Sequence, residues 1–215
     1  MLKGSDIILA STHRLFSEKL YDEIKTNYNI ELNREKLIWG SVSPDIYPKY
    51  KLYRHYYEES INFIALRVMK LIHTYRNLDF RNISYKRLKS FSRELGVITH
   101  YLADYTCLAH DRKWTFPIDM KIHIDYEARL DEYSKNHEFK RIRFDRSYLQ
   151  VDALGVFDEF ENIKKFIQSV VLEYREEVDL SRDLNYALSL NICMTNYIME
   201  SILEYSNKKV PAYSY

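Results

Sequence analysis

Eight side chains that could bind metal ions lie within the first 127 residues of the chain. They are His13, Asp45, His55, His100, Asp104, His110, His123 and Glu127. Imidazole and carboxylate groups are the ligands that zinc takes in catalytic sites, which keep one position open for water. Structural zinc sites are built largely from cysteine, and no cysteine belongs to this set. The residue types therefore indicate a hydrolytic metal centre.

The spacing of the densest part of this set places ligands on shared helix faces. His100 and Asp104 are four residues apart, and so are His123 and Glu127. Residues four apart on a helix project from one face, so each pair could bind one ion, or its carboxylate could bridge two. His110 lies six residues after Asp104, off the face that His100 and Asp104 share. That position suits a second ion nearby.

Each of these residues taken alone has a simpler interpretation. A histidine and a carboxylate four apart are more often a hydrogen bond or ion pair on a helix surface. His13 alone is an ordinary histidine in a first helical turn, and Asp45 after Pro44 is a helix cap or turn residue. The joint pattern favours metal binding because it contains five of the seven histidines. His73 and His137 fall outside it, and we expect them to be surface or boundary residues.

Apolar residues recur at three- and four-residue steps along most of the chain, which predicts an all-α fold. Only four glycines and four prolines interrupt it. The predicted helices are 11–27, 54–76, 85–107, 121–136, 157–175 and 181–206. Residues 41–48 are predicted as a loop because Pro44 and Pro48 interrupt helical hydrogen bonding, and 114–117 as a second loop. Without a repeat or linker, residues 1–215 are expected to form a single compact domain.

Bulk composition limits the partners of the chain. Lys and Arg total 32 and Asp and Glu 31, so no global field recruits nucleic acid or an anionic membrane. Cys107 and Cys193 are expected to be buried free thiols. The apolar run at the N-terminus is too short for a secretory signal, and residues 186–199 carry polar groups that indicate a buried helix rather than a transmembrane segment. We therefore expect a cytoplasmic protein with no transmembrane segment.

These motifs resemble the bacterial zinc-dependent phospholipases C, which are related to the zinc nucleases specific for single strands. The family's His-x-x-x-Asp with a further His six residues on stands here as His100, Asp104 and His110. The phospholipase branch continues with His-x-x-Tyr-Glu, here His123, Tyr126 and Glu127. The resemblance extends from His13 to Glu127, and the remaining helices would complete the same all-helical domain.

The resemblance implies which residues bind which ion. Asp45, His55, His100 and Asp104 would bind one zinc, and His110, His123 and Glu127 a second. A third zinc would be bound by His13 together with the N-terminal amine and carbonyl, with Asp104 as a bridging ligand. The family's mature N-terminus is a tryptophan exposed by cleavage, whereas this chain begins Met1-Leu2, so two zincs are better supported than three. The family's aromatic residue after the loop aspartate is Ile46 here, so no choline pocket is implied.

The implied activity is hydrolysis of a phosphodiester, with glycerophospholipid cleaved to diacylglycerol and a phosphorylated head group. Asp45 would be the general base or would orient the attacking water. Trp114 and Phe116 are candidates for an apolar lip that inserts into a membrane, which would make the contact peripheral.

Three alternatives remain open. A zinc nuclease for single strands could stack bases on the 20 tyrosines, although Glu127 and the short gap before His123 follow the phospholipase pattern. The adjacent pair His110-Asp111 is typical of another phosphohydrolase type, which would leave His123 and Glu127 without a role. The third is a metal-binding module without catalysis.

Overall fold

The computed structural model describes residues 4–50, 52–114, 119–149 and 155–207, and the side chains of residues 11–204 within those ranges. The regular elements in these ranges are helices, and no strand occurs among them. They are α1 (Gly4–Tyr28), α2 (Arg34–Ile46), the 3₁₀ turn η1 (Pro48–Tyr50), α3 (Tyr57–Tyr75), α4 (Tyr85–Asp104), α5 (Leu108–Asp111), α6 (Met120–Ser134), α7 (Val156–Tyr174) and α8 (Leu180–Asn207). The all-α prediction is confirmed.

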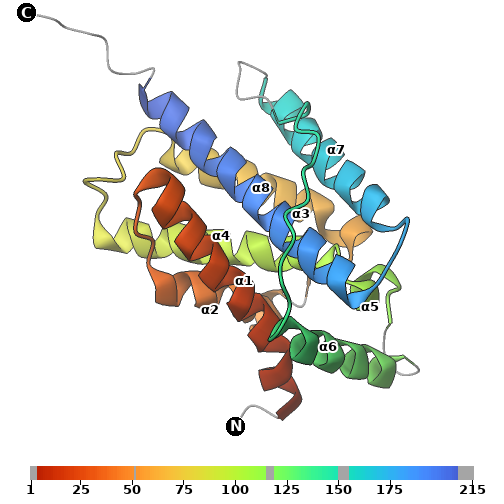
Figure 1. The fold of residues 1–215 in the computed structure, drawn as a ribbon. Coiled ribbons are helices and arrows are strands. Elements are labelled where there is room, and N and C mark those ends of the chain that lie inside the picture. Colours follow the sequence, from red (N-terminus) through yellow and green to blue (C-terminus); the bar gives the residue numbers. More distant parts are fainter. Residues whose placement is uncertain (1–3, 51, 115–118, 150–154, 208–215) are drawn as a thin grey trace, which may run out of the picture.

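The helices α4 and α8 form the centre of the bundle (Figure 1). α8 packs against α1, α3, α4, α6 and α7, and α4 packs against α2 and α3. α8 is buried without interruption from Asp183 to Ile192, and α4 from Leu95 to Asp104. This burial explains the long uncharged segment of α8, since a helix covered on all sides has no solvent face to carry charges. Within the described ranges, no helix is long and apolar enough to cross a bilayer.

Amphipathic stripes position the outer helices on this centre. Ile64 and Val68 of α3 and Ile163 and Phe166 of α7 are fully buried, as their helical spacing predicts. Each such side chain stabilises the fold by about 1.5–3 kcal/mol when buried. Phe157, the first residue of the predicted helix 157–175, is instead 72% exposed. Cys107 is buried and Cys193 half-buried, both as free thiols.

The predicted loop at 41–48 is wrong, because residues 34–46 form helix α2 with Pro44 inside its last turn. A proline in a helix leaves the carbonyl four residues earlier without its donor. Here the Ser43 hydroxyl donates to that carbonyl, on Gly40, at 3.2 Å. The helix then closes normally, with the Tyr47 amide donating to the Ser43 carbonyl at 2.8 Å. Asp45 therefore lies on a helix rather than in a loop.

Two glycines allow α2 to cross α4 at very short range. A Cβ atom on Gly40 would lie 2.2 Å from the Arg93 carbonyl oxygen, and one on Gly96 would lie 2.2 Å from the Leu37 carbonyl oxygen. Neither distance is sterically possible, so only hydrogen fits at both positions. The crossing brings the last turn of α2 beside the carboxyl end of α4.

Candidate metal centre

The carboxyl end of α4 carries the most deeply buried pair of candidate ligands. His100 is fully buried and Asp104 is 3% exposed, and both lie on the same helix face, four residues apart. The His100 Nε2 atom lies 3.1 Å from Asp104 Oδ2. α4 ends at Asp104 rather than at the predicted residue 107, and the chain continues into the short helix α5.

The first ligand set forms around this pair. Asp45 Oδ1, from the last turn of α2, lies 3.4 Å from both His100 Nε2 and His55 Nδ1. His55 Nδ1 lies 3.0 Å from Asp104 Oδ2 and 3.2 Å from His100 Nε2. The four ligand atoms thus converge on one small volume.

His55 is positioned by a loop rather than by a helix. The predicted helix 54–76 begins at Tyr57, two residues after His55. The hydroxyl of Tyr101, next to His100 on α4, donates to the Tyr53 carbonyl at 3.0 Å. This bond fixes the loop close to the point where His55 leaves it.

The second ligand set combines α5 and α6. Glu127 Oε1 lies 3.1 Å from His110 Nε2 and 2.8 Å from His123 Nε2. His123 and Glu127 share one face of α6, and His110 reaches them from the four-residue helix α5. The three ligand atoms lie within 4.8 Å of one another.

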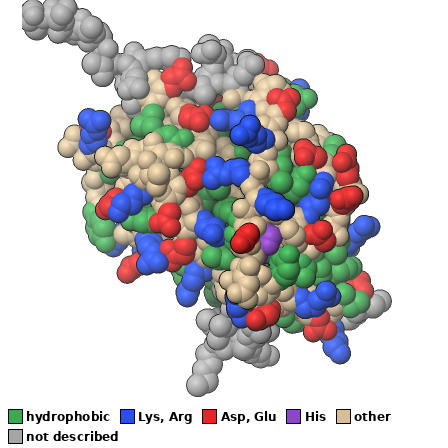
Figure 2. Space-filling model, in the orientation of Figure 1, with side chains coloured by type: hydrophobic (Ala, Val, Ile, Leu, Met, Phe, Trp, Pro, Cys, Tyr) green, Lys and Arg blue, Asp and Glu red, His purple; other side chains and the backbone are tan. Residues whose placement is uncertain are grey.

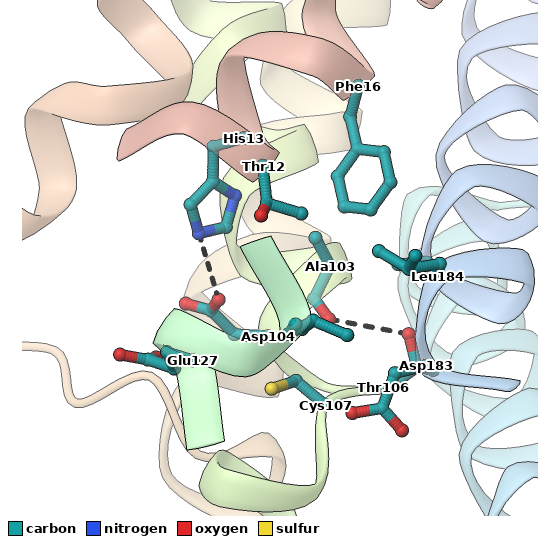
Figure 3. Close-up of a pocket in the computed structure, with 12 residues that line it drawn as sticks. Thr12, His13, Phe16, Ala103, Asp104, Thr106, Cys107, Glu127, Asp183 and Leu184 are labelled. Atoms are coloured by element: carbon teal, nitrogen blue, oxygen red, sulfur yellow. Dashed lines mark hydrogen bonds and ion pairs between the residues drawn. The ribbon is translucent and has the colours of Figure 1, made fainter. Parts of the chain in front are cut away.

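Asp104 lies between the two sets. Its Oδ2 atom faces His55 and His100, whereas its Oδ1 atom lies 3.3 Å from His13 Nε2 and 3.6 Å from His110 Nε2. Figure 3 shows His13 of α1 pointing at this carboxylate, with Glu127 on the other side of it. One carboxylate therefore has an oxygen for each set, which is the arrangement of a bridging ligand.

His13 is the candidate ligand for a third ion. Its side chain also groups with Asp45 and His100 within ligand distance. Helix α1 continues back from His13 to Gly4, about 13 Å along its axis at the usual rise per residue. Met1, whose amine the family resemblance would use, lies outside the described residues.

Backbone carbonyls fix the orientation of two histidine rings. The Nδ1 atom of His100 donates to the Ser41 carbonyl at 2.7 Å, and that of His123 to the Trp114 carbonyl at 2.9 Å. A carbonyl oxygen only accepts, so Nδ1 carries the proton in both rings. In the neutral ring Nε2 then presents a lone pair to the ligand set, as metal-binding histidines do.

Several buried polar atoms in the centre lack a hydrogen-bond partner. Among them are Asp104 Oδ2, Glu127 Oε2, His13 Nδ1 and His110 Nδ1. Asp104 Oδ2 is close to two ring nitrogens but forms no hydrogen bond of normal geometry with either. Leaving a buried carboxylate oxygen unpaired costs several kcal/mol, unless a cation satisfies it. The two unpartnered carboxylate oxygens, Asp104 Oδ2 and Glu127 Oε2, therefore fit groups directed at cations.

The charges of the centre interact strongly. Burial opposes the charged form of Asp45, but the neighbouring His100 and His55 lower its pKa to about 2. Burial likewise lowers the pKa of His110, but Asp104 and Glu127 more than compensate and raise it to about 9. The pKa of His55 is lowered, mainly by burial. Three carboxylates this close together need positive charge, which histidine protons or divalent cations can supply.

The remaining histidines lie elsewhere and have other partners. His73 Nε2 pairs with Glu159 Oε2 at 2.8 Å, and His137 Nε2 with Asn185 Oδ1 at 2.9 Å. Asp111 accepts a hydrogen bond from Arg175 at 2.5 Å, so the adjacent pair His110-Asp111 does not supply two ligands to one ion. Phe116 lies outside the described residues, and Trp114 is half-buried against Tyr126.

Comparison with known proteins identifies the family of this chain. The profile of the zinc-dependent phospholipase C family matches residues 12–181, so the chain belongs to that family. The zinc-dependent hydrolase chemistry of the family is consistent with ligand sets made of nitrogen and oxygen alone.

A solved structure shares the fold. It is the crystal structure of Clostridium perfringens alpha-toxin isolated from avian strain SWCP, with a TM-score of 0.54 and 15% sequence identity. The match covers 96% of this chain and 65% of the alpha-toxin chain. A comparison with curated proteins finds no match.

Proposed function

We propose that this protein is a zinc-dependent phospholipase C that cleaves glycerophospholipids to diacylglycerol and a phosphorylated head group. The position of Asp104 carries the proposal: its two oxygens face two separate ligand sets, as a two-metal hydrolytic site requires. Family membership supports the class of reaction. The first set would hold one zinc and the second set another.

Bound zinc would polarise the phosphodiester and lower the pKa of water toward neutrality. Asp45 is suited to orient that water. Its side chain is 28% exposed, the most open of the eight candidate ligands, whereas His100 is fully enclosed. With its pKa lowered to about 2, the Asp45 carboxylate is ionised at neutral pH and accepts hydrogen bonds. The water oxygen would bond to phosphorus as the bond from phosphorus to the glycerol oxygen breaks, and a proton from the water would end on that glycerol oxygen.

Contact with the lipid surface would rely on local apolar groups rather than on charge. Positive and negative side chains are interspersed on the face shown in Figure 2, in keeping with a net charge of +1. Exposed apolar residues instead neighbour the ligands in the chain. Tyr47, Leu52 and Ile122 are 50%, 85% and 51% exposed and lie close in sequence to Asp45, His55 and His123. Such side chains suit peripheral contact with a bilayer.

The test compares two substrates and two classes of variant. Zinc-loaded protein is assayed for diacylglycerol release from phosphatidylcholine micelles and for cleavage of single-stranded DNA. We expect lipid turnover by the unaltered protein and a loss of about 1000-fold or more in His100→Ala and Asp104→Ala, because each removes a metal ligand. Zinc content should fall in both variants.

The matched controls are His73→Ala and His137→Ala, which remove histidines outside the centre. Both should keep full turnover and full zinc content. Turnover of DNA but not of lipid would contradict the proposal, and so would tight zinc binding with neither activity. Equal losses in all four variants would also contradict it.

A further inference from the structure

Asp183 is a buried carboxylate of α8 that lies outside the set of candidate ligands. It is 1% exposed and accepts three hydrogen bonds. The donors are the Leu108 amide at 3.0 Å and the Tyr126 hydroxyl at 2.8 Å, both to Oδ2, and the Tyr174 hydroxyl at 2.6 Å to Oδ1. One side chain thus joins the start of α5, the middle of α6 and the end of α7 to α8.

The bond to Leu108 holds the short helix that carries His110. Leu108 is the first residue of α5, and the side chain of its N-cap residue, Cys107, makes no capping bond. The first amides of a helix need an acceptor, and Asp183 supplies one from another part of the chain. A helix of four residues is not stable by itself. The position of His110, two residues after Leu108, therefore depends on the hydrogen bond between the Leu108 amide and Asp183.

The other two ligands of the second set connect to the same carboxylate. Tyr126 directly precedes Glu127 on α6, so its bond to Asp183 fixes the turn that presents Glu127. His123 is linked to α5 through Trp114. The Trp114 amide donates to the carbonyl of Ala109 in α5 at 3.2 Å, and the Trp114 carbonyl accepts the hydrogen bond that orients the His123 ring. The first set rests instead on the crossing of α2 and α4 and on Tyr101.

We propose that Asp183 is a positioning residue for the second metal: it holds His110, His123 and Glu127 in the arrangement that binds zinc. Asp183 and Glu127 line one small cavity, with Cys107 between them in the close-up (Figure 3). Burial of this carboxylate is unfavourable and raises the pKa of Asp183, and the three donors offset part of that cost. The inference rests on the proposed two-zinc centre.

Two variants with the same chemical change test this role. Tyr126→Phe and Tyr174→Phe each remove one hydroxyl that donates to Asp183, but only Tyr126 adjoins a ligand. The full chain, freed of metal, is titrated with zinc against a chelating dye that competes for it. Tyr126→Phe should lower the affinity for one of the two zinc ions by about 10–100-fold, the usual effect of losing a group that supports a ligand. The affinity for the other zinc ion should not change. Tyr174→Phe should change neither by more than about threefold.

Thermal unfolding of the metal-free proteins separates positioning from general stability. We expect Tyr126→Phe and Tyr174→Phe to lower the midpoint by similar amounts, although only the former weakens zinc binding. Asp183→Asn is the third variant, since the amide keeps one acceptor oxygen and loses the other. It should weaken the same single zinc at least as much as Tyr126→Phe does.

Equal loss of zinc affinity in both tyrosine variants would overturn the role, and so would joint weakening of both zincs. Unchanged affinity in Tyr126→Phe and Asp183→Asn would also overturn it. In these three cases the unaltered chain still binds two zincs, so the proposed centre stands. Fewer than two zincs on the unaltered chain would overturn the centre and the positioning role together.

Discussion

At the scale of single residues, Asp104 links the two halves of the centre. Its two oxygens lie within 3.6 Å of ring nitrogens from four histidines on α1, α4, α5 and the loop before α3. A monodentate ligand to one ion would leave its second oxygen buried and unpaired, which is costly. A carboxylate shared by two ions would use both oxygens, which fits the place of Asp104 between the two sets.

The charges of the centre predict opposite pH dependences for metal-free and zinc-loaded protein. In the metal-free state the pKa of His110 is raised from 6.5 to about 9 by Asp104 and Glu127, against the effect of burial. The folded form then binds this proton more tightly than the unfolded chain does. Its stabilising contribution is complete below about pH 6.5 and is lost as the pH rises through about 9, up to about 3 kcal/mol in all.

Zinc reverses the direction in which stability changes with pH. It needs the unprotonated imidazole, so it binds more tightly and stabilises the fold more as the pH rises. Thermal unfolding at several values between pH 6.5 and 9 should show the metal-free midpoint falling and the gap to the zinc-loaded protein widening. His110→Gln, which has no titratable ring, should flatten the fall in the metal-free protein. A metal-free midpoint that rises over this range would contradict the charge assignment.

Sequence spacing located the candidate ligands but not the groups that orient them. Imidazole and carboxylate types are visible in a sequence, and four-residue steps place them on one helix face. The carbonyls of Ser41 and Trp114, which orient His100 and His123, belong to the backbone and have no sequence signature. Asp183 is one of many acidic residues in sequence, and only its three buried donors distinguish it.

At the scale of elements, the crossing of α2 and α4 decides whether Asp45 reaches the centre. A methyl group on Gly96 would meet the Leu37 carbonyl at 2.2 Å, so Gly96→Ala must push the two helices apart. We expect a loss of about 3 kcal/mol or more, since overpacking of this kind acts on backbone that cannot move aside. The unfolding midpoint should fall by about 6–12 °C. The affinity for the zinc ion that Asp45 would bind should fall as well.

Gly155→Ala is the matched control for this prediction. Gly155 precedes α7, and a Cβ atom there would make only an ordinary contact of 3.4 Å with the Asp158 side chain. Unfolding and zinc titration of this variant should resemble those of the unaltered chain. Equal midpoints for Gly96→Ala and the unaltered chain would show that the close crossing does not support the centre.

The elements that sequence patterns missed are those whose hydrogen bonds are supplied from outside the local pattern. Pro44 predicts the end of a helix, yet the Ser43 hydroxyl donates to the Gly40 carbonyl that Pro44 leaves without a backbone donor. Helix α5 has four residues, too few for a periodic pattern, and takes its cap from α8. A signal for the helix crossing was present, since Gly40 and Gly96 are two of only four glycines in the chain.

At the scale of the whole molecule, the apolar bundle brings together candidate ligands from five helices and one loop. The long amphipathic helices were predictable because their apolar stripes recur with helical period over many turns. Their relative placement was not, because a stripe shows which face is buried but not which helix covers it. The convergence of His13, Asp45 and His100 from α1, α2 and α4 depends on that placement.

Anomalous scattering at the zinc absorption edge, from crystals of protein purified with zinc, locates the bound ions themselves. We predict two peaks roughly 3.5–4 Å apart, the spacing of known two-metal sites, with Asp104 between them. One should lie among Asp45, His55 and His100, and the other among His110, His123 and Glu127. If neither set showed a peak and zinc bound only elsewhere on the molecule, these residues would not form a two-metal centre.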